Sequence, residues 1–329
     1  MNNSYFKRLN LAKTFFICLF FILLIYIFNN HIALKVAFAE KYDVSDLIFE
    51  NSHFMHIDEV QLHYRIWQPT ENNHRGHILL IHGLSGSTFS WRYVVDSLVE
   101  KGYSVVAVDL PGFGLSQRKP AVSQSNVNRA KLMLGLIENI EFKGPWHLVG
   151  HSIGGGVVVS MALQKISDIE SIVLVAGLID NKSNRILSLL FKSRFFRTVT
   201  AKFIDRFFLT KKRIQSFLNS AYGREPTPEE LEGYYKPLQL NYTYLTLSQL
   251  FKNYSSDNDL LGNLNKIRVP VLCLWGSNDD WVPVSKGEKI VQEIPDAKLL
   301  LIKEAKHCPM ETHPEIFNQY LFNFLEKNS

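Results

Sequence analysis

Three side chains in this sequence have the types and order needed for a nucleophile, a base and an orienting acid. Ser152 lies in the pentapeptide Gly150-His151-Ser152-Ile153-Gly154, between a short apolar run and a stretch of small residues. A G-x-S-x-G pentapeptide in that setting is typical of a tight strand-to-helix turn that presents a serine hydroxyl at a cleft. An ordinary glycine-rich turn would contain the same residues, so the interpretation depends on the partners of the serine.

The partners are expected after Ser152 in the chain. A serine hydroxyl is a poor nucleophile at neutral pH and needs a base that a third group orients. Among eleven histidines, His307 follows the last predicted strand in a short loop before the final helix. In this arrangement the orienting carboxylate precedes the histidine in the chain. Asp279 and Asp280 both follow the preceding strand, so both are candidates.

Two backbone amides are expected to bind the negatively charged oxygen of a tetrahedral intermediate. One is the N–H of Ile153, the residue after the nucleophile. The other is expected in the loop His82-Gly83-Leu84-Ser85-Gly86, and we predict the N–H of Leu84.

These residues can meet only if a sheet aligns the ends of their strands. A β-hairpin is predicted within 55–67, with further strands at 77–81, 103–108, 146–150, 172–176, 269–275 and 298–302. Helical spacing occurs at 91–100, 126–140, 154–162, 285–293 and 314–325. Alternating strands and helices predict an α/β fold, a mostly parallel sheet with helices on both faces. The candidate residues follow the carboxyl ends of these strands, where such sheets bind ligands.

The alternation stops after Gly177 and resumes at Val269. The intervening segment, 178–268, is polar and aromatic, has helical periodicity, and is divided by Pro226, Pro228 and Pro237. We predict a helical insertion after the sixth strand.

Five motifs in this order resemble the α/β-hydrolase superfamily from about Phe54 to Leu325. They are His82-Gly83, Asp109-x-x-Gly112-x-Gly114-x-Ser116, Gly150-x-Ser152-x-Gly154, the acid loop Trp275-Gly276-x-x-Asp279-x-x-x-Pro283, and His307 with Glu311 and Pro314 downstream. The resemblance implies that Asp279 rather than Asp280 is the acid, and that His307 is the base. It also implies a core made of 40–177 and 269–329, with 178–268 as a cap domain over the active site.

The resemblance also implies the type of reaction. Dehalogenases and epoxide hydrolases of this superfamily carry aspartate at the position of Ser152, whereas serine implies an acyl-enzyme. We therefore expect a serine esterase or lipase acting on a small-molecule ester or lipid, with no cofactor. An acyltransferase, a hydrolase of carbon–carbon bonds in diketone-like substrates, a cofactor-free perhydrolase and a non-catalytic binding protein on this scaffold are the alternatives.

Composition limits the other classes of function. Of 329 residues, 46% are hydrophobic and 20% charged, which is ordinary for a globular protein. The net charge of +5 is modest and does not indicate a nucleic-acid partner. Cys18, Cys273 and Cys308 form neither a disulfide framework nor a metal-binding pattern, so no metal is expected. We expect Cys273 and Cys308 to be free thiols rather than a pair. The composition does not indicate an oligomeric state.

Residues 1–39 are predicted to be a signal peptide or a membrane anchor. Basic residues precede the apolar run 15–28, and Ala37-Phe38-Ala39 forms a cleavage pattern. An uncleaved anchor is the alternative, with the basic flank in the cytoplasm. Both interpretations place the catalytic domain outside the cytoplasm, either periplasmic or extracellular or held at the membrane.

The early part of the predicted cap is basic. Between 182 and 213 there are ten lysines and arginines and a single acid, Asp205, interleaved with apolar residues. This pattern is typical of a helix that lies on a membrane surface, and it also fits a cap with a solvated charged face. We expect a preference for apolar acyl chains.

Overall fold

A computed structural model describes residues 42–70, 74–119, 122–179, 200, 208–247 and 260–328. Residues 40–329 form a compact unit of their own. The predicted signal peptide or anchor, 1–39, lies outside the described residues. None of the helices found in the described ranges combines the length and the apolar character needed to cross a membrane.

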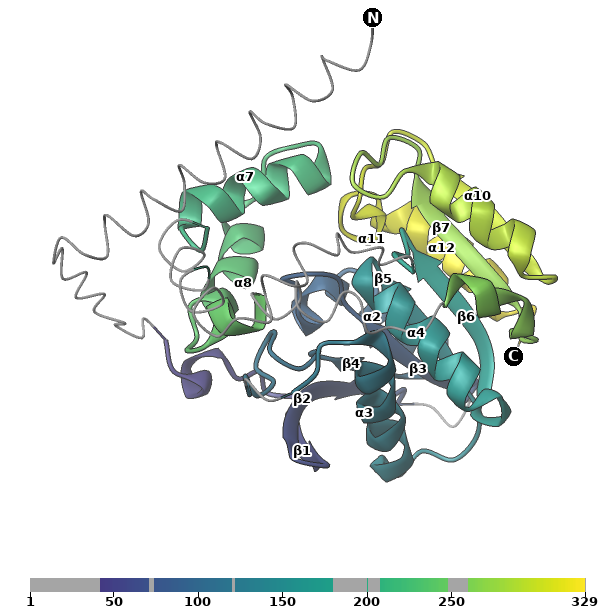
Figure 1. Cartoon of the computed structure of the whole chain (residues 1–329), viewed down its shortest axis with the longest axis horizontal. Coiled ribbons are helices and arrows are strands. Elements are labelled where there is room, and N and C mark those ends of the chain that lie inside the picture. Colours follow the sequence, from purple (N-terminus) through teal and green to yellow (C-terminus); the bar gives the residue numbers. More distant parts are fainter. Residues whose placement is uncertain are drawn as a thin grey trace, which may run out of the picture. The chain divides into compact units, whose positions relative to one another are not determined.

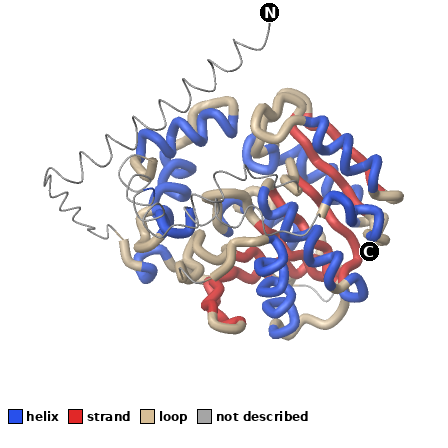
Figure 2. Tube along the Cα trace, in the orientation of Figure 1, coloured by secondary structure: helices blue, strands red, loops and turns tan. Residues whose placement is uncertain are grey.

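The centre of this unit is a single sheet (Figures 1 and 2). In the described residues its strands are β1 (Ser52–Ile57), β2 (Val60–Trp67), β3 (Gly76–Ile81), β4 (Tyr103–Val108), β5 (Trp146–His151), β6 (Ile169–Val175), β7 (Val271–Gly276) and β8 (Ala297–Ile302). Their order across the sheet is β1-β2-β4-β3-β5-β6-β7-β8. The β1–β2 and β2–β4 pairs are antiparallel, and all later pairs are parallel. The mostly parallel sheet and its N-terminal hairpin are confirmed.

Helices cover both faces of the sheet, as predicted. The helices of the described residues are α2 (Val95–Glu100), α3 (Asn126–Asn139), α4 (Ile153–Gln164), α7 (Lys211–Tyr222), α8 (Pro228–Leu238), α10 (Val284–Glu293), α11 (Pro309–Thr312) and α12 (Pro314–Leu325). Of these, α7 and α8 belong to the predicted insertion between β6 and β7. Short 3-10 helices are η1 (Val44–Leu47), η2 (Thr88–Trp91), η3 (Ile166–Asp168) and η4 (Leu261–Lys266).

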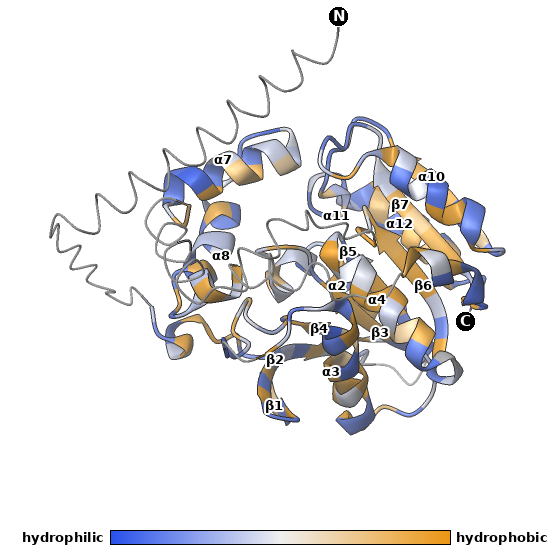
Figure 3. Cartoon of the chain, in the orientation of Figure 1, coloured by the Kyte–Doolittle hydropathy of each residue, from blue (hydrophilic) through white to orange (hydrophobic). Residues whose placement is uncertain are grey.

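Strand residues alternate between two apolar cores. Leu79 and Ile81 of β3 pack in the cluster that contains α3, α4 and α10 residues. Ile78 and Leu80 pack in the cluster that contains α2 and α12 residues. Because successive side chains of a strand point to opposite faces, a continuous apolar run indicates a strand buried on both sides. Figure 3 shows the hydrophobic colouring of these central strands.

Several predicted elements differ in their bounds. The strand predicted at 172–176 runs from Ile169 to Val175. Of the expected helix 91–100, the part that is α-helical is α2, and Trp91 ends the 3-10 helix η2. The strand expected from Val269 begins instead at Val271. Pro270 immediately precedes this strand, and its nitrogen has no hydrogen to donate to the hydrogen bonds between strands.

The segment between β6 and β7 is helical where it is described, without a strand in those residues. Pro228 is the first residue of α8, and Thr227 caps that helix by accepting from the N–H of Glu230. Pro237 lies in the last turn of α8 rather than between elements. Most of the basic stretch falls in 180–199 and 201–207, outside the described residues. The domain boundaries at 177/178 and 268/269 stay a prediction.

The two C-terminal cysteines are free thiols, as expected. Cys273 on β7 and Cys308 before α11 are both buried and unpaired. Burial raises the pKa of the Cys273 thiol to about 12, so it stays protonated at neutral pH.

Candidate active site

Ser152 occupies the strained turn between β5 and α4. Its φ is 51° and its ψ is −116°, and its N–H donates to the carbonyl of Val175 (2.9 Å). A Cβ on Gly154 would lie 2.6 Å from the carbonyl oxygen of Ile81, and one on Gly150 would lie 2.5 Å from the carbonyl oxygen of Gly154. Only glycine fits these two positions, so the pentapeptide forms the expected elbow.

The predicted base and acid are in contact. Nδ1 of His307 lies 2.9 Å from Oδ2 of Asp279, and both side chains are buried. Oδ1 of Asp279 accepts hydrogen bonds from the N–H groups of Trp281 (2.8 Å) and Val282 (3.0 Å). An ionised Asp279 therefore accepts the Nδ1–H of His307 and leaves Nε2 with a lone pair. Asp280 instead forms an exposed ion pair with Lys306 (2.8 Å).

Ser152 and His307 line one cavity of about 170 Å³. Within the described residues no hydrogen bond joins Oγ of Ser152 to the imidazole of His307. Catalytic hydrogen bonds are commonly long without substrate and shorten when substrate binds. The predicted nucleophile and the predicted base therefore face the same cavity.

The two predicted oxyanion donors also line this cavity. Across the described ranges, the amides of Leu84 and Ile153 donate to no protein acceptor, so both N–H groups remain for a ligand. Ile153 is the first residue of α4, where helical N–H groups lack intrahelical acceptors and the helix dipole favours negative charge. Nδ1 of His82 donates to the carbonyl of Gly83 (2.6 Å) while its Nε2 accepts from the N–H of Leu110 (2.9 Å), which fixes the loop before Leu84.

The cavity wall is mostly apolar. No lysine, arginine, aspartate or glutamate is among the described residues that form it. Its apolar members are Leu84, Ile153, Leu178, Phe217, Leu218, Ala221, Trp281 and Val282.

A buried polar network joins the predicted cap to the loop of His307. The carboxylate of Glu311 on α11 is fully buried and accepts from the hydroxyls of Tyr222 (2.7 Å) and Tyr234 (2.6 Å). It also pairs with Arg92 (2.5 Å). Burial alone would lower the pKa of the Arg92 guanidinium, but the carboxylate of Glu311 raises that pKa above its ordinary value.

A second carboxylate extends the network on the cap. Glu230 of α8 is almost fully buried and contacts Arg92 (3.1 Å) and Arg224 (2.8 Å). The N–H of His307 also donates to the carbonyl of Ala221 at the end of α7 (3.0 Å). Of this network, the sequence indicated only Glu311, through its family position. Its partners Tyr222, Tyr234 and Arg92 each lie more than 70 residues from Glu311 in the chain, and none of them belongs to a recognisable motif.

A second serine, histidine and aspartate lie in contact elsewhere. Nε2 of His63 is 2.8 Å from Oγ of Ser52, and its Nδ1 is 2.6 Å from Oδ2 of Asp109. The carboxylate of Asp109 also accepts from the N–H groups of Thr88 (2.6 Å) and Leu115 (2.7 Å). Ser52 does not line the cavity of Ser152. This set holds the turn that begins at Asp109.

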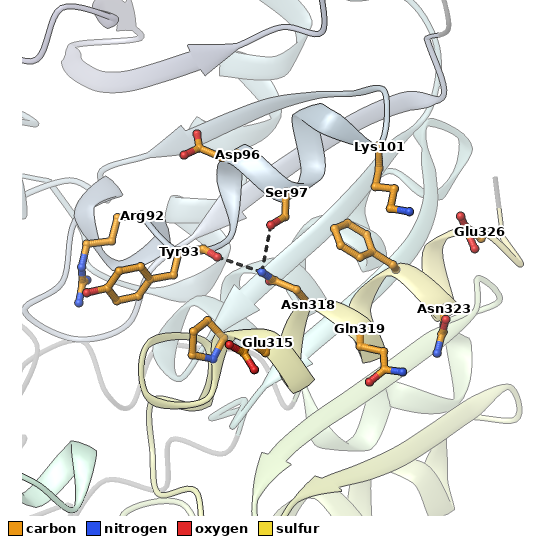
Figure 4. A pocket seen from close by; sticks show the side chains of 12 residues that line it. Arg92, Tyr93, Asp96, Ser97, Lys101, Glu315, Asn318, Gln319, Asn323 and Glu326 are labelled. Carbon is orange, nitrogen blue, oxygen red and sulfur yellow. Dashed lines mark hydrogen bonds between the residues drawn. The ribbon is translucent and has the colours of Figure 1, made fainter.

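A larger cavity of about 670 Å³ lies between α2 and α12 (Figure 4). Nδ2 of Asn318 crosses it to the carbonyl of Tyr93 (2.9 Å) and to Oγ of Ser97 (3.4 Å). None of the predicted site residues lines it, and its wall carries charges of both signs. Although this cavity is the larger of the two, its lining residues give no reason to place the reaction in it.

Comparison with known proteins identifies the fold and the family. A family model described as the alpha/beta hydrolase fold matches residues 76–314. An uncharacterized hydrolase of Bacillus subtilis, YugF, is 28% identical over 274 residues, which cover 82% of this chain and 96% of that protein. A 2-hydroxy-6-oxononadienedioate/2-hydroxy-6-oxononatrienedioate hydrolase of Burkholderia vietnamiensis is 26% identical over 266 residues, covering 76% of this chain and 87% of that protein.

Two solved structures share the fold. A membrane phospholipase A described as a bacterial virulence factor has a TM-score of 0.68 and 23% identity, covering 98% of this chain and 98% of its own. A thermophilic esterase from Thermogutta terrifontis has a TM-score of 0.67 and 20% identity, covering 84% of this chain and 99% of its own.

Proposed function

The chain belongs to the α/β-hydrolase family, and from this premise we propose that it is a serine hydrolase that cleaves carboxylic esters through an acyl-enzyme on Ser152. One observation carries the proposal. Ser152 lies in a strained turn, and His307 contacts Asp279. Both line the same mostly apolar cavity as Leu84 and Ile153, whose N–H groups donate to no acceptor in the described residues. That set matches the needs of acyl transfer.

Each step of the reaction uses one of these groups. Oγ of Ser152 attacks the ester carbonyl carbon and passes its proton to Nε2 of His307. The oxyanion accepts from the N–H groups of Leu84 and Ile153, and one such donor is worth about 3–4 kcal/mol. His307 then protonates the leaving alcohol, and the acyl-enzyme forms. A water molecule then gives a proton to Nε2 of His307 while its oxygen attacks the acyl carbon. The bond between that carbon and Oγ of Ser152 breaks, His307 returns the proton to Oγ, and the acid leaves.

A carbon–carbon bond hydrolase is the second candidate, because curated relatives carry that name. The substrate in their name is a dioate and therefore bears two carboxylates. A buried carboxylate needs a cation or several donors. The described wall offers neither lysine nor arginine, which favours an uncharged ester with apolar groups over a dioate.

We also propose that the chain is exported and that residues 1–39 direct this export. The support is the basic flank, the apolar run and the cleavage pattern of the sequence. We further propose that the enzyme hydrolyses lipid esters close to a membrane surface. This part of the proposal rests on the basic stretch 182–213. A reporter enzyme that is active only outside the cytoplasm, fused after Ala39, should be active; an expressed but inactive reporter would contradict export.

The esterase proposal is tested by labelling and turnover together. The wild-type protein is expected to hydrolyse p-nitrophenyl esters and to bind a fluorophosphonate covalently at Ser152. Ser152→Ala should lose both, with turnover falling by about 10⁶-fold, because the nucleophile is removed. Ser52→Ala is the matched control and should keep both, since Ser52 does not line the cavity.

Other outcomes would identify the alternatives. A wild-type protein that is neither labelled nor active on any ester contradicts the proposal and supports a binding protein. Faster turnover of a 2-hydroxy-6-oxo-dienedioate than of every ester would assign carbon–carbon hydrolysis. Transfer of the acyl group to an added alcohol in preference to water would assign an acyltransferase.

A further inference from the structure

Trp281 separates the histidine of the site from the cap. It lies in the loop after β7, two residues after Asp279, to which its N–H donates. The centre of its ring is 5.1 Å from the centre of the His307 imidazole, with 32° between the planes. On the cap side, the ring of Phe217 meets it edge-on at 4.6 Å and 65°. Trp281 is therefore packed between the imidazole of His307 and α7.

Helix α7 holds this indole at two points. The indole N–H donates to Oγ of Ser220 (2.9 Å). Phe217 and Ser220 are three residues apart, so they lie on the same face of the helix. The carbonyl of Ala221, next along α7, accepts the N–H of His307. The orientation of Trp281 is thus fixed by the same helix that contacts the loop of the base.

The position of Trp281 determines which part of an ester it meets. In acylation, the leaving oxygen must come within hydrogen-bond reach of Nε2 of His307, which protonates it. Groups attached to that oxygen then lie beside the imidazole, where Trp281 forms the wall. The acyl group, in contrast, is held with its carbonyl oxygen at the amides of Leu84 and Ile153.

We propose that Trp281 is a specificity-determining residue that limits the size of the alcohol of the ester. This inference rests on the proposed ester hydrolysis and extends it by naming a substrate class, esters of compact apolar alcohols. The cavity of about 170 Å³ is smaller than the roughly 300–1,000 Å³ of pockets for drug-sized ligands, so loss of an indole enlarges it substantially.

Two series of esters test the inference. One series keeps the acetyl group and varies the alcohol from methyl to hexyl and benzyl. The other keeps the ethyl alcohol and varies the acyl group from acetyl to octanoyl. For Trp281→Ala, kcat/KM for the largest alcohols relative to methyl should rise at least tenfold, because one methylene in a fitted apolar pocket changes selectivity by roughly 10–200-fold. The relative profile of the acyl series should stay within about twofold of the wild type.

The rate of deacylation distinguishes this role from a structural one. All esters of one acid form the same acyl-enzyme, from which the alcohol has already departed. Deacylation of acetyl-Ser152 should therefore be unchanged in Trp281→Ala, measured after the burst. If Trp281 mainly positioned His307, this rate would fall together with acylation, because His307 serves both steps.

Milder variants keep the test valid if Trp281→Ala does not fold. Phe217→Leu, on the outer side of the indole, and Ser220→Ala, which removes its hydrogen-bond acceptor, should shift the alcohol profile in the same direction by smaller factors. Trp281→Phe should lie between the wild type and Trp281→Ala. An altered acyl profile with an unaltered alcohol profile, or slower deacylation, overturns the inference. A wild-type protein inactive on both series would instead contradict the proposed function.

Discussion

Ser52 and Ser152 differ in the features that favour Ser152 as the proposed nucleophile. Ser52 lies beside a buried histidine that contacts an aspartate, as the proposed mechanism requires of Ser152. However, Ser52 accepts the N–H of Phe49 (3.0 Å), and it borders no part of the reaction cavity. Ser152 has the strained φ of 51°, the cavity and the unused amides. The proposal for Ser152 therefore rests on the cavity and the amides as well as on contact among three side chains.

Asp279 and Asp280 offer a matched test of the acid. Asp279→Asn should lower kcat by about 10⁴-fold, because an amide cannot hold the Nδ1–H tautomer of His307 or stabilise the imidazolium. Asp280→Asn should stay within a few-fold of the wild type, since that carboxylate is exposed and contacts Lys306. Steady-state turnover of one p-nitrophenyl ester measures both variants. Equal losses in the two variants would mean that the acid is assigned wrongly.

The site residues that could be predicted from the sequence are those for which the chemistry allows few residue types and only one order along the chain. Ser152, Asp279 and His307 follow strand ends in the order that acyl transfer on this fold requires, and glycines identify the elbow. Trp281 and Arg92 could not be predicted in the same way. Tryptophan and arginine occur in many structural contexts, and their roles depend on the docking of α7 and α8. That docking arises from contacts between residues far apart in the chain.

Among the elements, the sheet was the most predictable part and the cap the least. Apolar runs of five or six residues locate buried strands, because both faces of a parallel sheet are covered. Helices α7 and α8 lie within 178–268, the segment that was predicted to be a helical cap. Apolar side chains of α7 and α8 pack in a core cluster, and polar contacts add to them: hydroxyls and guanidinium groups meet the buried carboxylates of Glu230 and Glu311. Helical periodicity carries no information about such pairs.

Glu230 and Glu232, two residues apart on α8, test the strength of the polar contact. Glu230 is almost fully buried between Arg92 and Arg224, whereas Glu232 pairs with Lys211 at the surface. Glu230→Gln should lower the free energy of unfolding by about 2 kcal/mol, because it removes buried charge-assisted hydrogen bonds and leaves Arg92 with Glu311 as its remaining charged partner. Glutamine can still cap α8 at Thr227, so the helix start is kept.

The matched variant Glu232→Gln should cost less than about 1 kcal/mol, as exposed ion pairs do. Urea unfolding monitored by circular dichroism gives both values. Similar midpoints for the two variants would show that the buried contact does not stabilise the fold.

For the whole molecule, the sheet buries histidines as well as apolar residues. His147 on β5 is 2% exposed, and its Nδ1 is 2.8 Å from Oγ of Ser171 on β6. The ring of His77 on β3 packs against Trp146 at 5.2 Å. Burial, together with the nearby His77, lowers the pKa of His147 from 6.5 to about 4. The fold thus requires this imidazole to be neutral.

This requirement links the stability of the whole fold to pH. In the unfolded chain His147 binds a proton near pH 6.5, but in the folded protein only near pH 4, so between these values the unfolded state binds more protons. The stabilisation is complete above pH 6.5 and is lost as the pH falls toward 4. At about 1.4 kcal/mol per pKa unit, His147 contributes a loss of about 3 kcal/mol over this window.

His147→Gln, which can still bond Ser171 but does not titrate, should flatten the fall in the free energy of unfolding between pH 6.5 and 4 by that amount. His56→Gln, the same change at an exposed position, is the control. Urea titrations at half-unit pH intervals measure the slopes, and parallel curves for the wild type and His147→Gln would show that the buried imidazole is not the group that titrates.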